Sequence, residues 1–512
     1  MSEHAPPDGG DPIVVTDSLT GESQVFEPIE DDRVRLYYCG LTTSDPPHLG
    51  HARGWVHVDV MVRWLRERGY SVAHVENFTD VNEKIVARIG EDGDDERSVA
   101  RSYIEAVITA MRGLGCERAD AYPRVSRHVD EIVALVETLI ERGFAYEVDG
   151  SVYFDVTAFE AYGALSNQDL DAIESQGDTD ERTEKRHPAD FALWKAGGVD
   201  PDAIADHRHE GAAPPEEAVE GAQTWDSPWG EGRPGWHIEC SAMSTAHLGE
   251  TIDIHVGGQD LVFPHHENEI AQSEAATGEE FVRYWLHVGL LETADEKMSS
   301  SLGNFATVAE AIDEYGAGVV RTFLLSTAYD SRATYSQATI DEARDRFETL
   351  ERGHRRAREA ADSVDADACT GDEALRDAIS GARSEARDGL NDDFNTRRAL
   401  AALESATGAV NRHVDRGPPY DYPGLREAID CYETIGIDVL GLPLGEGPAD
   451  DATGGKHDEG NLADALIELV LEMREEERDA GRYDRADALR DRLEALDVAV
   501  EDTDDGPTYR RQ

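Results

Sequence analysis

Four side chains of this sequence have the chemistry of a metal site. Cys39 ends a short apolar run, and Cys240 lies in the segment GWHIECSAM. His265 and Glu269 are four residues apart in PHHENEIAQSEA, on one face of a helix expected to open at Pro264. Two thiols, an imidazole and a carboxylate make a plausible zinc set. Their wide separation along the chain suits an active-site cleft better than a compact structural zinc finger.

The spacing of these residues leaves other interpretations open. Cys39 and Cys240 could be small core residues, and Glu269 could be a surface acid of a helix. His266 is three residues from Glu269, so helical periodicity does not choose between His265 and His266. The five cysteines include no C-x-x-C pair and are too scattered for a disulfide framework, which leaves reduced thiols or metal ligands.

A second group of residues suits a bound polyphosphate. His48, Gly50 and His51 follow two prolines and open an expected helix, where backbone N–H groups and two imidazoles would converge at a positive helix end. Gly50 would let a flat base approach the backbone closely. Much later, EKMSSSLGN forms an expected loop around Lys297, and a loop lysine can move onto phosphates as charge develops. Each segment alone is a weak signal, but together and in this order they are a strong one.

The residues around these motifs predict an α/β catalytic domain. Residues 33–40 form an apolar run typical of a strand, residues 51–69 have helical periodicity, and residues 70–80 indicate a second strand. This β-α-β unit is half of a doubly wound parallel sheet.

The next segments combine helices, a hairpin and an insertion. Helical patterns continue over residues 81–144, and a hairpin follows with its turn at 149–150. Residues 165–233 are rich in charge, Gly and Pro, which indicates an insertion. Strand signals resume in TIDIHVGGQDLVF and YWLHVGLLE.

The carboxy-terminal third is predicted to be helical. Residues 338–441 have heptad-like apolar spacing, which is typical of a helical bundle. Residues 445–461 have the composition of a flexible acidic linker. A last helical pair over 463–496 leads into two short extended runs around residues 506–507.

The chain is strongly acidic, with 108 Asp and Glu against 48 Lys and Arg and a net charge of −60. Such acidity is typical of disorder, but the periodic apolar segments indicate a folded protein whose acids lie on solvated faces. A diffuse acidic surface resembles that of proteins from salt-accumulating archaea, where concentrated salt screens self-repulsion.

The amino terminus lacks a basic start and an apolar run, and no segment approaches the ~20 apolar residues of a membrane span. We expect a cytoplasmic protein without a membrane partner.

The motifs HLGH, KMSSS, PGWHIECSAM and FPHHENEIAQSEA resemble the cysteinyl-tRNA synthetase family of class I aminoacyl-tRNA synthetases. The resemblance runs from about Arg33 to Arg511. It implies a Rossmann-like, doubly wound catalytic domain with an insertion, then an α-helical anticodon-binding bundle and a small carboxy-terminal domain. The expected division is an N-terminal extension 1–32, a catalytic domain 33–337 with an insertion at about 117–233, a bundle 338–444, an acidic linker 445–461 and a helical C-terminal domain 462–512.

The resemblance also implies a reaction and a set of site residues. Cysteine and ATP, with Mg²⁺, would give cysteinyl adenylate and pyrophosphate, and the cysteinyl group would pass to the 3′ end of cysteine tRNA. One Zn²⁺ per chain would recognise the substrate thiolate. The residues expected by resemblance are Cys39, Cys240, His265 and Glu269 for zinc; His48, His51 and Lys297 for catalysis; Leu41, His48, Gly50, His51, Lys297, Ser299, Ser300 and Ser301 for ATP; and Thr79, Trp236, Gly257, Gly258 and Asp260 for the amino-acid and adenylate pocket.

The chain departs from the family pattern in the KMSSS loop. The family usually has KMSKS, so Ser300 replaces a lysine, one cationic contact to ATP is missing, and Lys297 would carry more of the interaction. Two other functions stay open: a related ligase that joins cysteine to an amino sugar without tRNA, and a non-catalytic tRNA-binding protein. The long helical region after Ala338 argues against the first, and the intact His48, His51 and Lys297 argue against the second.

Overall fold

The computed structural model describes residues 6–170, 173, 184–293 and 307–445, and the backbone of two strands at 498–503 and 506–511. The chain divides into two compact units, Met1–Glu446 and Gly447–Gln512. Among the helices that the structure describes, none is both long and apolar enough to cross a membrane.

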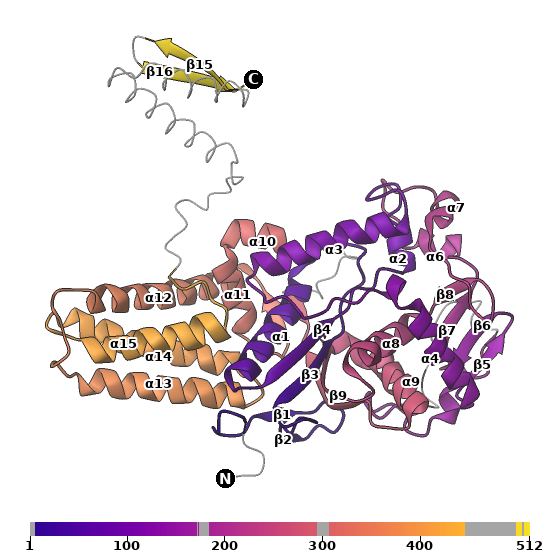
Figure 1. Ribbon diagram of the computed structural model, residues 1–512, viewed down its shortest axis with the longest axis horizontal. Coiled ribbons are helices and arrows are strands. Elements are labelled where there is room, and N and C mark those ends of the chain that lie inside the picture. Colours follow the sequence, from indigo (N-terminus) through magenta and orange to yellow (C-terminus); the bar gives the residue numbers. More distant parts are fainter. Residues whose placement is uncertain are drawn as a thin grey trace, which may run out of the picture. The chain divides into compact units, whose positions relative to one another are not determined.

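A four-stranded parallel sheet lies at the centre of the first unit, with the strand order β10-β9-β3-β4 (Figure 1). Its strands are β3 Arg33–Tyr38, β4 Ser71–Glu76, β9 Ile252–Gly258 and β10 Val282–Val288. Helix α1, Leu49–Glu67, connects the neighbouring parallel strands β3 and β4. The predicted β-α-β unit is therefore confirmed. Parallel strands bring their carboxyl ends to one edge of the sheet, which is where ligands bind in open α/β folds.

Helix α1 packs closely against the sheet because one of its residues has no side chain. At Gly54, an added Cβ atom would lie 1.8 Å from the hydroxyl oxygen of Tyr38 at the end of β3. Most of the helix is buried, including Trp55, Met61 and Trp64. The close approach holds α1 directly against the end of β3.

An antiparallel sheet with the order β5-β6-β7-β8 forms a second layer of the first unit. The predicted hairpin is confirmed, because β5 and β6 pair across a turn in which Asp149 (φ 49) and Gly150 (φ 90) have left-handed backbone. The charged, Gly- and Pro-rich segment supplies β7 and β8, which extend the hairpin. The elements of this part are α2 Glu83–Val86, α3 Glu96–Gly113, η1 Val125–Arg127, α4 Val129–Glu141, β5 Ala145–Val148, β6 Ser151–Phe154, η2 Val156–Ala158, β7 Phe191–Ala196, α6 Pro201–Ala205, α7 Pro215–Ala218, η4 Val219–Gly221 and β8 Gly232–Pro234.

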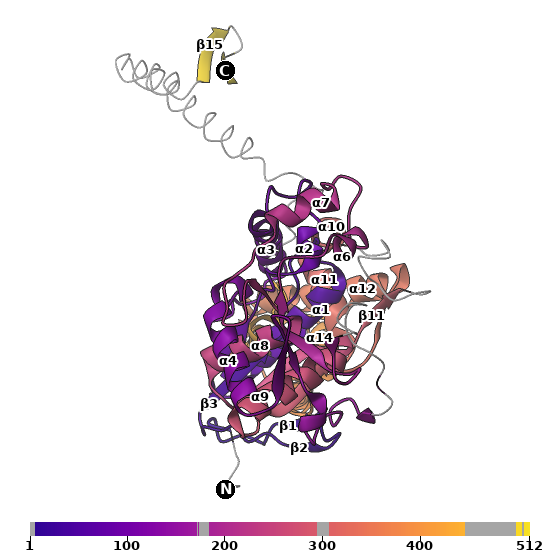
Figure 2. The ribbon, with the colours of Figure 1, turned by 90° about the vertical axis from the view of Figure 1, so that its right-hand side faces the viewer.

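Helices α8, Trp236–Leu248, and α9, Glu267–Thr277, pack against each other and against α4. Figure 2, turned by 90°, shows the three helices close together beside the parallel sheet. Two short helical turns, η5 Gln259–Leu261 and η6 Val262–His266, connect β9 to α9. Phe263 interrupts the helical backbone, which resumes at Pro264 and continues into α9. This agrees with a helix that opens at the proline.

The helices predicted from the heptad-like pattern form a bundle at one end of the first unit (Figure 1). They are α12 Gln337–Ala361, α13 Glu373–Asn391, α14 Thr396–Asp415, α15 Tyr422–Cys431 and the π-helical η8 Tyr432–Val439. Smaller elements complete the unit: β1 Val14–Thr16, β2 Ser23–Val25, β11 Leu291–Thr293, α10 Val308–Tyr315, α11 Ala317–Leu325, β12 Ala333–Tyr335, β13 Ala366–Asp367 and β14 Tyr420–Asp421. The two extended runs near the carboxyl terminus are confirmed as β15 Val498–Thr503 and β16 Gly506–Arg511, while the expected helices at 463–496 lie outside the described residues.

A buried ion pair connects α1 to the helical part of the same unit. Arg321 of α11 donates to the carboxylate of Asp59 in α1, and its Nε atom donates to the carbonyl oxygen of Leu440 at 2.6 Å. Asp59 also accepts from Arg63 Nε at 2.9 Å. Burial opposes the ionisation of Asp59, but the positive charges of Arg321 and Arg63 outweigh this effect and lower its pKa. The carboxylate is therefore charged at neutral pH, and its pair with Arg321 fixes α1, which carries His48 at its start, against α11.

We expect Asp59→Ala to lower the free energy of unfolding by about 3–5 kcal/mol, because the guanidinium of Arg321 would stay buried without its counter-charge. Glu105→Ala is the matched control. It removes an exposed pair with Arg101 and should cost less than about 1 kcal/mol. Urea unfolding in molar KCl measures both values, and equal losses in the two variants would contradict the structural role given to Asp59.

Candidate active site

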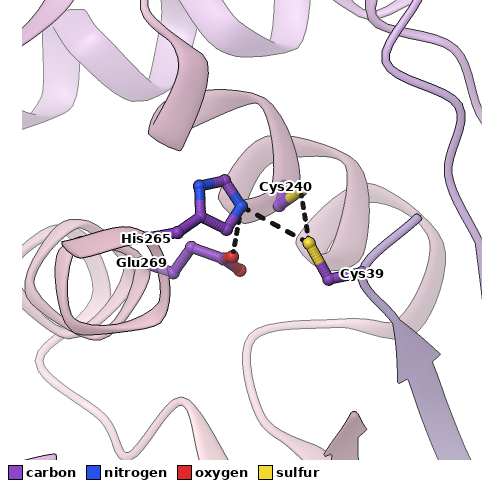
Figure 3. Close-up of side chains that lie close together, drawn as sticks. All are labelled: Cys39, Cys240, His265 and Glu269. Atoms are coloured by element: carbon purple, nitrogen blue, oxygen red, sulfur yellow. Dashed lines mark hydrogen bonds and ion pairs between the residues drawn. The ribbon is translucent and has the colours of Figure 1, made fainter. Parts of the chain in front are cut away.

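Four buried donor atoms converge at the carboxyl end of the parallel sheet (Figure 3). The Sγ atom of Cys39, just after β3, lies 3.6 Å from Sγ of Cys240 in α8 and 3.4 Å from Nε2 of His265. Nε2 of His265 lies 3.0 Å from Oε1 of Glu269. One ligand atom from each residue falls within 4.8 Å of all the others. The geometry thus selects His265 over His266, a choice that the sequence left open.

The donor set fits a zinc ion. Two thiols, an imidazole and a carboxylate are zinc ligands, and all four side chains are at least 94% shielded from solvent. Among the described residues, Oε1 of Glu269 accepts no well-aligned hydrogen bond, and its one close cationic neighbour is the ring of His265 at 3.0 Å. A buried carboxylate oxygen without a well-aligned hydrogen bond is costly, and a cation at this position would satisfy it.

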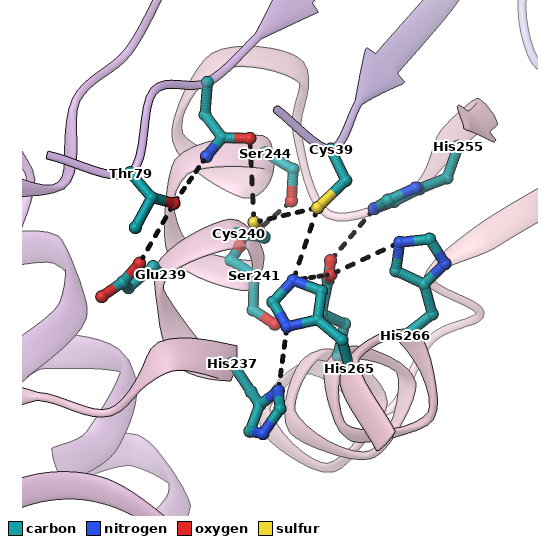
Figure 4. A network of polar contacts seen from close by, with 12 residues as sticks. Cys39, Thr79, His237, Glu239, Cys240, Ser241, Ser244, His255, His265 and His266 are labelled. Carbon is teal, nitrogen blue, oxygen red and sulfur yellow. Dashed lines mark hydrogen bonds and ion pairs between the residues drawn. The ribbon is translucent and has the colours of Figure 1, made fainter. Parts of the chain in front are cut away.

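Further polar residues orient the four donors (Figure 4). His255 Nε2 lies 3.0 Å from Oε2 of Glu269, and the Nδ1 atoms of His237 and His265 are 2.9 Å apart. These contacts fix the second oxygen of the carboxylate and the far side of the imidazole, as partners behind metal ligands commonly do. The sequence analysis did not identify His237 or His255. The only signal was the position of His237 three residues before Cys240.

The amide of Asn77 links the thiols to the sheet. Its Oδ1 atom accepts from the hydroxyl of Tyr37 at 3.0 Å and from the backbone N–H of Gly40 at 2.8 Å, and lies 3.8 Å from Sγ of Cys240. Asn77 follows β4, so it joins the ends of two neighbouring strands. This residue also went unnoticed in the sequence.

The protonation of the donors is set by burial and by their mutual contacts. The hydrogen bond with Cys39 and burial both raise the pKa of Cys240 well above its usual range. Burial, with Glu269 nearby, also raises the pKa of Cys39, against the effect of its hydrogen bond to Cys240. Burial opposes charge on both His265 and Glu269. The carboxylate of Glu269 nevertheless raises the pKa of His265 to about 10, and His255 and His265 together lower the pKa of Glu269 to about 2. Without a metal, both thiols and the imidazole carry protons at neutral pH.

A single cavity of about 390 Å³ joins the thiols to the start of α1. This volume is sufficient for a small-molecule substrate. Of the residues predicted from the sequence, the cavity wall contains Cys39, Leu41, His48, Gly50, His51, Thr79, Trp236, Cys240, Gly258, Asp260 and His265. Glu269 lies behind the wall, and Gly257 packs on His266, whose Cε1 atom is 2.3 Å from where a Cβ would be. Lys297, Ser299, Ser300 and Ser301 lie outside the described residues.

The two histidines at the start of α1 cap the helix reciprocally. The ring of His48 accepts the backbone N–H of Gly50 at 3.1 Å, and Nδ1 of His51 accepts that of His48 at 3.3 Å. The rings stack with centroids 3.7 Å apart. Burial, with a contribution from His48, lowers the pKa of His51 well below its usual range, so His51 is neutral. A side chain at residue 50 would collide with the His48 ring, which explains the glycine.

Comparison with known proteins gives the family. Residues 25–206 and 214–345 match the model of the "tRNA synthetases class I (C) catalytic domain", and residues 386–445 match the "DALR domain". Residues 463–510 match the "Cysteinyl-tRNA ligase anticodon binding domain". The chain is 65% identical to a cysteine–tRNA ligase of Haloarcula marismortui, over 97% of this chain and 99% of that protein. This chain belongs to the cysteine–tRNA ligase family.

Other relatives agree with this family. A cysteine–tRNA ligase of Halobacterium salinarum is 59% identical, over 97% of this chain and 99% of that protein. Both of these relatives come from haloarchaea, which fits the halophilic composition. The fold is similar to that of Mycobacterium tuberculosis methionyl-tRNA synthetase in complex with methionyl-adenylate, at 17% identity and a TM-score of 0.57, with 81% of this chain and 91% of that chain covered. The class I synthetase fold predicted from the sequence is therefore confirmed.

We expect zinc uptake by the metal-free protein to release about three protons at pH 7, from Cys39, Cys240 and His265, because their raised pKa values keep them protonated until a metal displaces the protons. Zinc affinity should therefore fall as the pH is lowered. Calorimetric titration with zinc in two buffers of different ionisation enthalpy measures the number of protons released. Cys240→Ser should release about one proton fewer, and an enthalpy that does not depend on the buffer would contradict the assignment.

Proposed function

We propose that this cavity is the place where the chain activates cysteine. As a member of its family, the chain is a class I aminoacyl-tRNA synthetase that uses cysteine, ATP and cysteine tRNA. One observation supports the placement of this reaction in the cavity. The cavity wall contains both the buried thiols and the paired histidines of α1. An amino acid held at one end could thus meet ATP held at the other.

We propose that Cys39, Cys240, His265 and Glu269 hold one zinc ion for amino-acid selection. Serine and cysteine differ by one atom, and a pocket that recognises shape alone gains only about 1–3 kcal/mol from so small a change. Bound zinc would favour a thiol, which loses its proton readily, over an alkyl hydroxyl, which is a weaker acid and a poorer ligand. Cys39 is then a structural ligand and not a nucleophile.

The remaining pocket residues would orient the amino acid. Thr79, Trp236, Gly258 and Asp260 line the cavity beside the thiols. The ring centroid of Trp236 lies 4.5 Å from that of His265, although 41% of the side chain is exposed. A large aromatic face left open to a cavity suits contact with a substrate. Gly257 would act indirectly, through its close packing on His266.

We propose that ATP, with Mg²⁺, binds against Leu41, His48, Gly50 and His51. The start of α1 offers backbone N–H groups and a positive helix end to the phosphates. The neutral ring of His51 can donate to a phosphate oxygen without a change of its protonation state. Lys297 and the serines of its loop would complete this contact during adenylate formation.

The family-model matches do not favour the two alternative functions. A ligase for an amino sugar needs no anticodon-binding domain, and such a domain matches residues 463–510. A non-catalytic tRNA-binding protein needs no cavity that joins thiols to the α1 histidines. We also propose the domain division given above and a cytoplasmic location. We further propose that the protein recognises tRNA through its shape, 2′-hydroxyl contacts and stacked bases, because salt weakens binding that depends on phosphate neutralisation.

We expect His265→Ala to lose bound zinc and cysteine-dependent ATP–pyrophosphate exchange together, by at least about 100-fold in rate, because one of the four ligands and its contact with Glu269 disappear. His247→Ala is the matched control, since His247 lies on α8 near the surface and pairs with His128. Zinc analysis and exchange assays in molar KCl measure both properties. If the His265→Ala protein contained no metal and still catalysed ATP–pyrophosphate exchange at the parent rate, the proposed role of zinc would be wrong.

A further inference from the structure

The cavity contains an unexplained basic residue. Lys84 is the one lysine or arginine among the described residues that line it. The acidic lining residues are Asp45 and Asp260, and the net balance is unfavourable for a triphosphate. A cation in this wall therefore has a large effect on the binding of an anionic substrate.

Lys84 lies on the side of the cavity where ATP would bind. It belongs to α2, which begins seven residues after the end of β4. Four residues on, Arg88 donates through Nη2 to Oδ1 of Asp45 at 2.9 Å. Asp45 is three residues before His48, and Asp45, His48 and Lys84 all line the cavity. Lys84 and the His48 segment therefore share this part of the wall.

The loops that carry these residues are held together by backbone contacts. The N–H of Thr43 donates to the carbonyl oxygen of Thr79 at 3.1 Å, and the N–H of Thr79 donates to that of Leu41 at 3.2 Å. The segment before α1 thus runs beside the segment before α2. Ile85 and Val86 are fully buried and anchor the short helix. The backbone of Lys84 has a fixed position from which its long side chain can reach a ligand.

The ammonium group is available for a ligand. In the described part of the chain, no side chain forms an ion pair or hydrogen bond with the ammonium group of Lys84, whose backbone N–H donates to Oδ1 of Asn82 at 3.0 Å. The nearby acid Asp45 has its own partners, because it pairs with Arg88 and lies 3.7 Å from Nε2 of His209. Asp45 therefore does not depend on Lys84 for a counter-charge.

We propose that Lys84 is a catalytic residue that contacts the β- and γ-phosphates of ATP. The proposal rests on the proposed function. In adenylate formation, a carboxylate oxygen of cysteine attacks the α-phosphorus, and the bond from that phosphorus to the α–β bridging oxygen breaks. Pyrophosphate leaves with the electron pair. Lys84 stabilises the negative charge that develops on it, a contact of special value where Ser300 replaces a loop lysine.

A comparison of ATP binding with adenosine binding distinguishes the loss of a phosphate contact from a general disturbance of the nucleotide site. We expect Lys84→Ala to weaken ATP binding by the zinc-loaded protein about 10- to 100-fold, the range for losing one hydrogen bond to a charged group. Adenosine binding should change less than about twofold, because adenosine has no phosphates. Lys84→Arg should retain most of the ATP affinity, and Arg101→Ala, on the exposed face of α3, is the control for loss of one positive charge.

Calorimetric titration in molar KCl measures these affinities, and ATP–pyrophosphate exchange measures the chemical step. Exchange by Lys84→Ala should fall at saturating cysteine, with an unchanged zinc content and an unchanged KM for cysteine. Equal ATP affinity in parent and Lys84→Ala, or equal losses for ATP and adenosine, would overturn the role of Lys84. Absence of cysteine-dependent exchange in the parent protein would instead overturn the proposed function, while the ATP titration still decides the role of Lys84.

Discussion

Burying an ionised carboxylate is unfavourable unless other groups bind it, and this constraint shapes the centre of the molecule. Glu269, Cys39 and Cys240 come from α9, the end of β3 and α8, and each is almost fully removed from solvent. The fold brings His255 and His265 to the carboxylate at 3.0 Å each. These contacts keep the carboxylate ionised, and a metal ion would complete them. The strands and helices of the first unit can therefore be understood as supports for one buried polar cluster.

The cluster and the start of α1 are positioned by the same strand. β3 ends at Tyr38, and Cys39 follows it directly, while the close contact of Tyr38 with Gly54 fixes α1 over the strand end. The separation of Cys39 from the capping histidines is thus set by the packing of α1 on the strand end. Such rigidity favours catalysis that depends on the positioning of two substrates in one cavity.

The sequence predicted the parts of this arrangement that depend on local patterns. Local apolar periodicity predicted the β-α-β unit, heptad-like spacing predicted the helical bundle, and the turn at Asp149 and Gly150 predicted the hairpin. The choice between His265 and His266 needed the tertiary structure, because both satisfy helical spacing to Glu269. His255 and Asn77 were missed because their partners are distant in sequence or belong to another strand. Lys84 was missed because a single exposed lysine on a short helix carries no pattern.

The central claim is that a zinc ion held by Cys39, Cys240, His265 and Glu269 distinguishes cysteine from serine through the substrate sulfur. X-ray absorption at the zinc edge, on the zinc-loaded protein in molar KCl, tests this claim most directly. Without substrate, the sulfur ligands should be the two thiolates of the protein. Addition of cysteine should contribute one more sulfur, and addition of serine should leave the spectrum unchanged. A zinc spectrum that does not respond to saturating cysteine would contradict the account.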